Sequence, residues 1–202
     1  YYDFINIDDN RLAVVVGDVS GHGVSAALLM ATARAFVMLR TSMPGSAASI
    51  INDVNKHLSL DTYDTGNFMT FFYCELKELS REISWVRAGH DPAILYDPDS
   101  DEFDELKGRG LAMGLDYSFE YEQSRRVLGL GQIILIGTDG IWEACSPGGE
   151  MFGKRRFQGV IRDYAKENAS NILSAVYDKL DHFTRGLKSE DDITLVIAKV
   201  QN

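Results

Sequence analysis

The order of apolar and polar residues predicts two strands and then two helices at the start of the chain. Residues 2–7 and 12–16 are rich in β-branched and aromatic residues and are separated by a polar turn, which is typical of two strands. Residues 25–39 are rich in Ala and Leu and are apolar on nearly every face, so we expect a buried helix there. A second helix is predicted from Ser46 to about Leu58, because apolar residues recur at helical spacing.

The remainder of the chain is predicted to contain mostly strands, with one further pair of helices. The predicted strands cover residues 68–76, 83–88, 93–96, 103–106, 119–127, 132–137 and 193–200. The two helices are predicted near residues 155–166 and 169–184. A regular alternation of strand and helix is absent, which argues against a doubly wound parallel sheet. We therefore predict a single α+β domain over residues 1–202, with largely antiparallel sheets covered by pairs of helices.

Composition and charge exclude several classes of protein. The chain has 202 residues, of which 45% are hydrophobic and 10% aromatic, enough apolar material for a folded core. Twenty Lys and Arg against thirty Asp and Glu give a formal net charge of −10, which is opposite to the basic surface that nucleic acids and anionic lipids attract. The longest apolar segment, residues 24–39, is shorter than the ~20 residues of a membrane-spanning helix. We expect no nucleic-acid partner and no direct membrane contact.

The cysteines and histidines form no recognisable disulfide or zinc pattern. Cys74 and Cys145 are far apart without CxxC spacing, and the four histidines show neither HxxxH nor HExxH spacing. Isolated cysteines suit a reducing compartment, so we expect a cytoplasmic protein. The sequence begins without Met and directly in a predicted strand, from which we expect the C-terminal part of a larger regulated protein.

Three carboxylates lie at the ends of predicted apolar strands. Asp18 and Asp139 closely follow runs of apolar residues, and Asp191 comes just before the last strand. A carboxylate beside a core strand is costly unless it has a partner, a proton or a cation. Oxygen ligands from several strand ends are what hard ions such as Mg²⁺ and Mn²⁺ prefer. An Asp at a strand end is, taken alone, most often a turn or helix N-cap residue, and this structural alternative stays open for each of the three.

Glycines flank two of these carboxylates. Gly17, Gly21 and Gly23 surround Asp18, and Gly140 follows the second carboxylate, so the backbone there can approach an ion or a phosphate closely. A helix that starts after Gly23 would direct free N–H groups towards the same place. Thr-Asp-Gly alone is a weak signal. The ordered set Gly-Asp-Val-Ser-Gly-His-Gly, Thr-Asp-Gly and Asp-Asp-Ile-Thr is far more specific.

Together these motifs resemble those of the metal-dependent protein phosphatases (PPM family), in the bacterial branch named after the stage II sporulation phosphatase SpoIIE. The resemblance extends over essentially the whole chain. The matching segments are residues 1–4, 17–23, 68–73, 87–93, 110–114, 136–140 and 191–194. The chain departs from the family pattern at Asp91, where Pro is usual, and at Ala112 and Met113, which replace the middle pair of a Gly-Leu-Pro-Leu-Gly loop.

The resemblance implies both a fold and a chemistry. The implied fold is a four-layer α/β/β/α sandwich, in which two antiparallel sheets are flanked by helix pairs. The implied activity is that of a protein-serine/threonine phosphatase with two Mn²⁺ or Mg²⁺ ions. Carried over by position, Asp18 bridges both ions and the Val19 carbonyl binds one, while Asp139 and Asp191 bind the other. A hydroxide would attack phosphorus in line, without a covalent enzyme intermediate.

His22 is a candidate proton donor within the first motif. It could protonate the leaving serine oxygen, although its place between two glycines also suits a purely structural role in the loop. His90 is expected to stabilise its own turn, with a place near the site as the alternative. Asp192 is expected to support the ligands rather than bind metal itself.

The resemblance also bears on metal occupancy and partners. The family usually carries Gly-Gly-Asp directly before the segment that matches residues 1–3, and that Asp contributes to the metal site. This sequence starts after that position, so we expect weak occupancy of one metal. The implied partners are a phosphorylated protein such as an anti-sigma-factor antagonist, an upstream sensor or receiver module in the same chain, and a second copy in a homodimer.

Two other functions remain as alternatives to a protein phosphatase. A catalytically inactive phosphatase-like module would bind its partner without dephosphorylating it. Retention of Asp18, Asp139 and Asp191 argues against this, and the missing N-terminal Asp argues for it. A nuclease or small-molecule phosphohydrolase is disfavoured by the net charge of −10.

Overall fold

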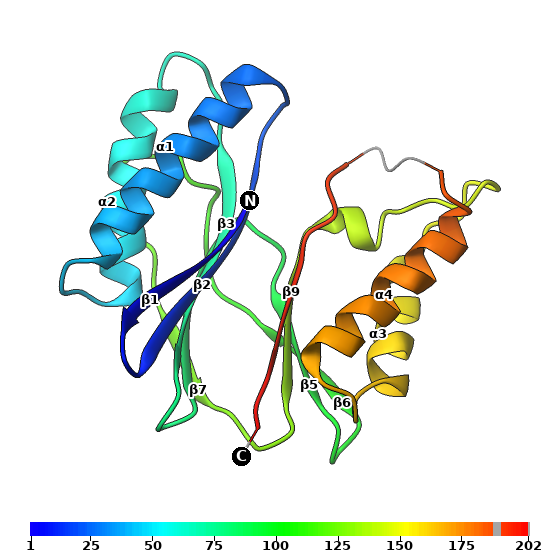
Figure 1. Ribbon diagram of the computed structural model, residues 1–202. Coiled ribbons are helices and arrows are strands. Elements are labelled where there is room, and N and C mark those ends of the chain that lie inside the picture. Colours follow the sequence, from blue (N-terminus) through cyan, green and yellow to red (C-terminus); the bar gives the residue numbers. More distant parts are fainter. Residues whose placement is uncertain (188–190, 202) are drawn as a thin grey trace. The chain divides into compact units, whose positions relative to one another are not determined.

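The computed structural model describes residues 1–187 and 191–201, which form two compact units. Unit 1 comprises Tyr1–Pro92 and Leu106–Leu128, and unit 2 comprises Ala93–Glu105 and Gly129–Asn202. We describe each unit by itself (Figure 1).

Unit 1 is built on a five-stranded antiparallel sheet with the strand order β1-β2-β3-β4-β7. The strands are β1 (Tyr2–Asp8), β2 (Arg11–Val19), β3 (Met69–Lys77), β4 (Glu82–Ala88) and β7 (Ser124–Val127). The pairing of β2 with β3 is continuous from Arg11↔Lys77 to Val19↔Met69. The polar run between the first two strands forms the expected turn, so both N-terminal strands agree with their prediction.

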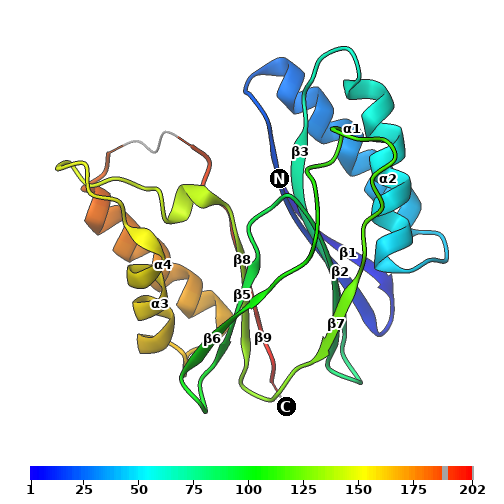
Figure 2. The same cartoon turned by 180° about the vertical axis from the view of Figure 1, so that it is seen from behind.

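Two helices, α1 (Val24–Thr41) and α2 (Ala47–Thr62), cover one face of this sheet (Figures 1 and 2). Ser46 caps α2 through a reciprocal bond with Ser49, in which each side chain accepts from the other residue's backbone N–H. Ala13 and Val15 of β2 belong to the core beneath the helices, as do Phe71 and Tyr73 of β3. Because side chains alternate along a strand, the even-numbered residues of these two strands face away from the helices.

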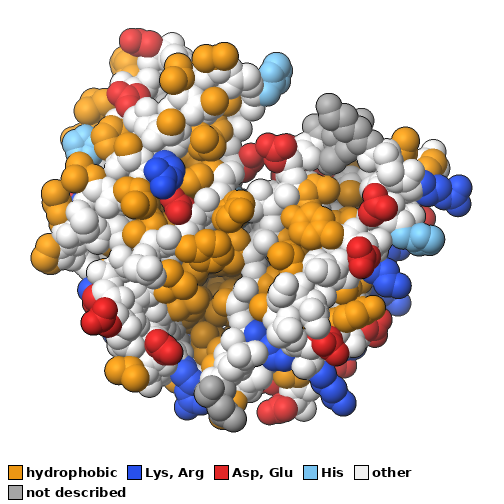
Figure 3. All heavy atoms as spheres, in the orientation of Figure 1, with side chains coloured by type: hydrophobic (Ala, Val, Ile, Leu, Met, Phe, Trp, Pro, Cys, Tyr) orange, Lys and Arg blue, Asp and Glu red, His pale blue; other side chains and the backbone are white. Residues whose placement is uncertain are grey.

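The prediction that the first helix is buried on nearly every face is wrong. Only Leu29, Ala33, Val37 and Thr41 of α1 are buried, while Leu28 is 64% exposed. The helix packs on the sheet along one stripe, and its other apolar residues contribute to the hydrophobic surface in Figure 3. Among the described residues, α1 is the one helix long and apolar enough to cross a membrane, which is weak evidence because core helices pass the same test.

Unit 2 contains a four-stranded sheet with the order β6-β5-β8-β9. The strands are β5 (Ala93–Asp97), β6 (Glu102–Leu106), β8 (Ile133–Gly137) and β9 (Leu195–Lys199). Helices α3 (Gly153–Asp163) and α4 (Ala169–Thr184) pack against this sheet through a second apolar core, and a single 3₁₀ turn, η1 (Asp139–Ile141), follows β8. Four α-helices and two antiparallel sheets in the described part of the chain confirm the predicted α+β class.

The strand predicted over residues 119–127 is confirmed only for Ser124–Val127. The preceding residues bond to α2 instead of to a neighbouring strand. The Tyr121 backbone N–H donates to Asn52 Oδ1 at 2.7 Å, and Asn52 Nδ2 donates to the Tyr121 carbonyl at 3.3 Å. An amide side chain therefore takes the place of a strand partner, which local sequence does not reveal.

The glycine-rich loop of residues 107–114 lies directly against the end of β4. Arg87 Nη1 donates to the Gly108 carbonyl at 2.8 Å, and Trp85 Nε1 donates to the Lys107 carbonyl at 2.8 Å. A Cβ placed on Gly110 would lie 1.7 Å from the Arg87 carbonyl oxygen, so only glycine fits at this position.

We predict that Gly110→Ala lowers the free energy of unfolding by about 1–3 kcal/mol, because the added methyl group must displace backbone atoms. Gly108→Ala is the matched control in the same loop. Its Cβ would meet the Arg87 Cβ at 3.3 Å, a contact that a shift of a few tenths of an ångström relieves. Urea unfolding followed by circular dichroism measures both changes, and equal stability of the two variants would contradict the prediction.

Candidate functional site

Asp18 and Val19 are the last two residues of β2, at the end of the sheet of unit 1. In the β2–β3 ladder, Asp18 lies directly opposite Thr70, and Val19 lies opposite Met69. Asp18 is half-buried and shares the strand face that points away from the helices. Gly17 is required beside it, because a Cβ there would lie 2.6 Å from the Met69 Cε and 2.9 Å from a backbone oxygen. Asp18 therefore follows a position at which only glycine fits against the neighbouring strand β3.

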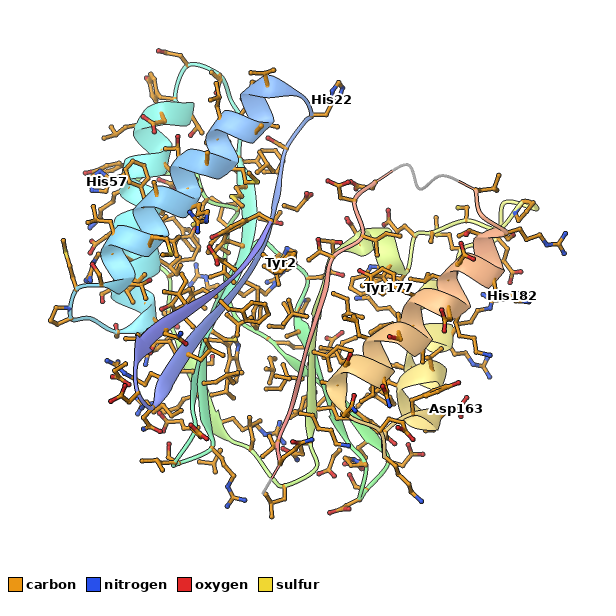
Figure 4. The ribbon with its side chains drawn as sticks, viewed as in Figure 1. Tyr2, His22, His57, Asp163, Tyr177 and His182 are labelled. Atoms are coloured by element: carbon orange, nitrogen blue, oxygen red, sulfur yellow. The ribbon has the colours of Figure 1, made fainter. Side chains whose placement is uncertain are left out.

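The loop after Val19 is fixed by a pair of bonds to the start of β3. The Ser20 backbone N–H donates to the Phe68 carbonyl at 2.9 Å, and the Phe68 N–H donates to Ser20 Oγ at 2.9 Å. Gly21 and Gly23 both have φ of 82°, a left-handed conformation that favours glycine. His22 between them is exposed and projects from the loop before α1 (Figure 4). Its predicted role as a proton donor stays a prediction.

The two acidic motifs of unit 2 lie next to one another. Thr138, at the end of β8, connects them with three hydrogen bonds. Its Oγ1 donates to the Asp192 carbonyl and accepts from the Thr194 N–H, and its own N–H donates to the Thr194 carbonyl, each at 3.0 Å. The adjoining Asp139 and Asp191 side chains belong to exposed residues. The chain thus brings two of the three predicted carboxylates to one end of this sheet.

In unit 2, as in unit 1, a glycine allows two backbone segments to pack closely together. A Cβ on Gly140 would lie 2.6 Å from the Asp192 carbonyl oxygen, so any larger residue would push the two acidic segments apart. Tyr177 of α4 adds a further restraint, since its hydroxyl donates to the Ile193 carbonyl at 3.3 Å (Figure 4). The Asp192 N–H donates to Asp191 Oδ1 at 2.8 Å, which orients that carboxylate.

The predicted metal ligands are divided between the units. Unit 1 carries Asp18 and the Val19 carbonyl, and unit 2 carries Asp139 and Asp191. Within the described residues, no group of three or more His, Cys, Asp and Glu side chains is close enough to hold a metal ion. The donors are all oxygen atoms, which suit Mg²⁺ or Mn²⁺, and glycine opens the backbone beside Asp18 and Asp139. The full ligand set stays a prediction, and the oxygen donors of these residues are compatible with it.

Several residues that shape the site escaped the sequence analysis. In the sequence, Thr138 stands out only as part of the Thr-Asp-Gly motif, and no motif contains Tyr177. His90 is buried, with its Nδ1 2.9 Å from Thr70 Oγ1. Since Thr70 is the cross-strand partner of Asp18, His90 belongs to the surroundings of the candidate site as well as to its own turn.

Comparisons with known proteins give a consistent result. Phosphoserine phosphatase RsbU of Bacillus subtilis is 25% identical over 202 residues, covering 98% of this chain and 58% of RsbU. The SiaA-PP2C domain of Pseudomonas aeruginosa superposes with a TM-score of 0.87 at 24% identity, covering 100% of this chain and 80% of that structure. RsbX in complex with magnesium superposes with a TM-score of 0.68 at 20% identity, covering 98% of this chain and 84% of that structure.

The chain spans between 35% and 58% of the length of the curated relatives that it matches. The structural matches are below 25% identity and establish the PP2C-type fold. The profile of the stage II sporulation protein E (SpoIIE) family matches residues 8–201, nearly the entire sequence. The chain therefore belongs to the SpoIIE family.

Proposed function

We propose that the chain is a metal-dependent protein-serine/threonine phosphatase that hydrolyses phosphoserine on a regulatory protein. The observation that carries this proposal is that Thr138, at the end of a buried strand, joins the chain segments that carry Asp139 and Asp191 by hydrogen bonds. Asp18 occupies the equivalent position at the end of β2 in unit 1. The relationship to RsbU, which is named a phosphoserine phosphatase, supports the same reaction.

The ligand set of the proposal is Asp18, the Val19 carbonyl, Asp139 and Asp191. Two bound Mn²⁺ or Mg²⁺ ions would neutralise charge on the phosphoryl oxygens and activate a water molecule for in-line attack. The protein orients these ligands through the Thr138 and Ser20 hydrogen bonds. When the bond from phosphorus to the serine oxygen breaks, that oxygen takes up a proton, for which the exposed His22 is the proposed donor.

A covalent enzyme intermediate is not part of this mechanism. Ser20, the hydroxyl nearest to Asp18 in sequence, already accepts a hydrogen bond from the Phe68 N–H. Burial raises the pKa of the Cys74 thiol to about 12, so it stays protonated and is a poor nucleophile at neutral pH. Ser20 and Cys74 therefore have structural roles. Their surroundings favour direct attack of water on phosphorus.

The proposed substrate is a phosphorylated protein of the anti-sigma-factor antagonist type, in the cytoplasm. An upstream sensor or receiver module in the same chain and homodimerisation complete the proposed assembly. The net charge of −10 supports a protein substrate over a nucleic acid, because it repels a polyanion.

We predict that Asp18→Asn abolishes Mn²⁺-dependent phosphate release from a phosphoserine protein, with a loss in kcat/KM of at least about 100-fold. Asp163→Asn is the matched control, since Asp163 is an exposed residue at the end of α3 (Figure 4). Its activity should stay within about twofold of the wild type. Phosphate release is measured with and without added Mn²⁺. An inactive wild type that still binds the phosphoprotein would support a non-catalytic binding module instead.

A second prediction concerns the hydroxyl that connects the acidic segments of unit 2. Thr138→Val removes one donor and leaves the Asp192 carbonyl and the Thr194 N–H without their partner, which should destabilise the protein by about 1–3 kcal/mol. Mn²⁺ affinity should fall by about 10- to 100-fold, because the orientation of Asp139 and Asp191 is loosened. Thr138→Ser keeps the hydroxyl and should retain most of both properties. Urea unfolding in EDTA and Mn²⁺ titration test this, and indistinguishable Val and Ser variants would refute it.

A further inference from the structure

His90 is a buried side chain for which the proposed reaction gives no role. Its imidazole Nδ1 lies 2.9 Å from Thr70 Oγ1, a hydrogen-bond distance, and only 3% of its surface is exposed. A buried imidazole is energetically unfavourable unless its polar atoms are used. The hydroxyl that it meets lies directly across the ladder from Asp18.

The turn that carries His90 holds the ring rigidly. Gly89 before it has φ of 74°, and a Cβ there would lie 2.8 Å from the Ala112 backbone nitrogen. Gly89 also forms a bridge with Phe71 of β3, next to Thr70. Arg87 Nε donates to the His90 carbonyl and fixes the far side of the turn. These contacts leave the imidazole little freedom to move away from the threonine.

Thr70 and Asp18 share one face of the sheet. Phe71 and Tyr73 of β3 point into the helix-covered core, so Thr70 points to the opposite face, as Asp18 does from β2. Directly opposed residues in an antiparallel pair have Cβ atoms about 4.5–5.5 Å apart. The order along this sheet edge is therefore carboxylate, hydroxyl, imidazole.

The Thr70 hydroxyl has a single proton to donate. The direction of this proton decides whether Asp18 faces a hydrogen-bond donor or the lone pairs of the hydroxyl oxygen. If Thr70 donated to His90, the hydroxyl would present lone pairs towards a neighbouring carboxylate, which is electrostatically unfavourable. If His90 Nδ1–H donates to Thr70 Oγ1, the hydroxyl proton is available to Asp18. The negative charge of Asp18 therefore selects the Nδ1-protonated tautomer of His90.

We propose that Thr70 and His90 are positioning residues for Asp18. His90 donates to Thr70, and the Thr70 hydroxyl donates to one oxygen of the Asp18 carboxylate, so that the other oxygen is turned towards the cation. Neither residue touches metal or substrate. The part of this inference that concerns metal affinity rests on the proposed function, whereas the tautomer of His90 belongs to the metal-free protein.

The first experiment is nitrogen-15 NMR of the imidazole in the metal-free chain at a pH at which His90 is neutral. The proton is expected on Nδ1 of His90 in the wild type. Thr70→Val should abolish the scalar or chemical-shift signature of the hydrogen bond, and Thr70→Ser should preserve it. A proton on Nε2 in the wild type would overturn the proposal, whatever the protein does with metal.

The second experiment measures Mn²⁺ binding by electron paramagnetic resonance. Thr70→Val should weaken the tighter site by about 10- to 100-fold, and Thr70→Ser by no more than about threefold. His90→Asn, whose amide can replace the Nδ1–H donor, should retain more affinity than His90→Leu. Thermal unfolding in EDTA serves as the control, because a purely structural role would lower the stability of the Val and Leu variants without a selective loss of Mn²⁺ affinity.

The outcomes separate this inference from the proposed function. If the wild type binds Mn²⁺ and the Thr70→Val variant binds it equally well, the positioning role is overturned and the phosphatase proposal stays intact. Wild-type protein that binds no Mn²⁺ overturns the phosphatase proposal and the part of this inference that concerns metal affinity, while the tautomer of His90 is still decided by the NMR experiment.

Discussion

The unfavourable energy of ending a buried strand in a carboxylate is the constraint on which the rest of this structure depends. Asp18 follows the buried residues of β2, and Asp139 follows β8, whose five residues are all buried. Asp139 is exposed, whereas the half-buried Asp18 needs hydrogen-bond donors, a proton or a cation. In each unit a glycine and a threonine hydroxyl group lie at the strand end that carries the carboxylate.

The two units meet this need in the same way. In each, glycine lets a neighbouring backbone segment approach a strand end, at Gly17 in unit 1 and at Gly140 in unit 2. In each, a threonine hydroxyl lies at that strand end, Thr70 across from Asp18 and Thr138 beside Asp139. Asp18 and Asp139 are thereby placed by the ends of β2 and β8. Such preorganisation suits ligands that must hold a divalent cation in one geometry.

Much of the fold could be predicted from the sequence because its signals are local. β-Branched and aromatic residues marked β1 and β2, and continuous apolar residues marked β8, so the carboxylates at these strand ends were also found. The sequence could not show that α1 packs along only one stripe, because Ala- and Leu-rich helices look alike whether one face or all faces are covered. It also could not show that Asn52 replaces a strand partner for Tyr121.

The contacts of Thr138 and Thr70 could not be predicted for a related reason. Thr138 and Asp192 are 54 positions apart, and Thr70 and His90 are 20 positions apart, so no spacing rule connects either pair. Their proximity arises from strand register and from the turn at Gly89, which are properties of the folded chain. Sequence motifs therefore gave the candidate ligands, and only the structure placed the hydroxyl groups of Thr138 and Thr70 near them.

The most direct test of the account is anomalous diffraction at the manganese edge from crystals grown with Mn²⁺. We predict anomalous peaks coordinated by the carboxylates of Asp18, Asp139 and Asp191, with the Val19 carbonyl as a further ligand. Peaks only at other surface positions, or none at saturating Mn²⁺, would contradict the assignment of these strand-end carboxylates as the metal site.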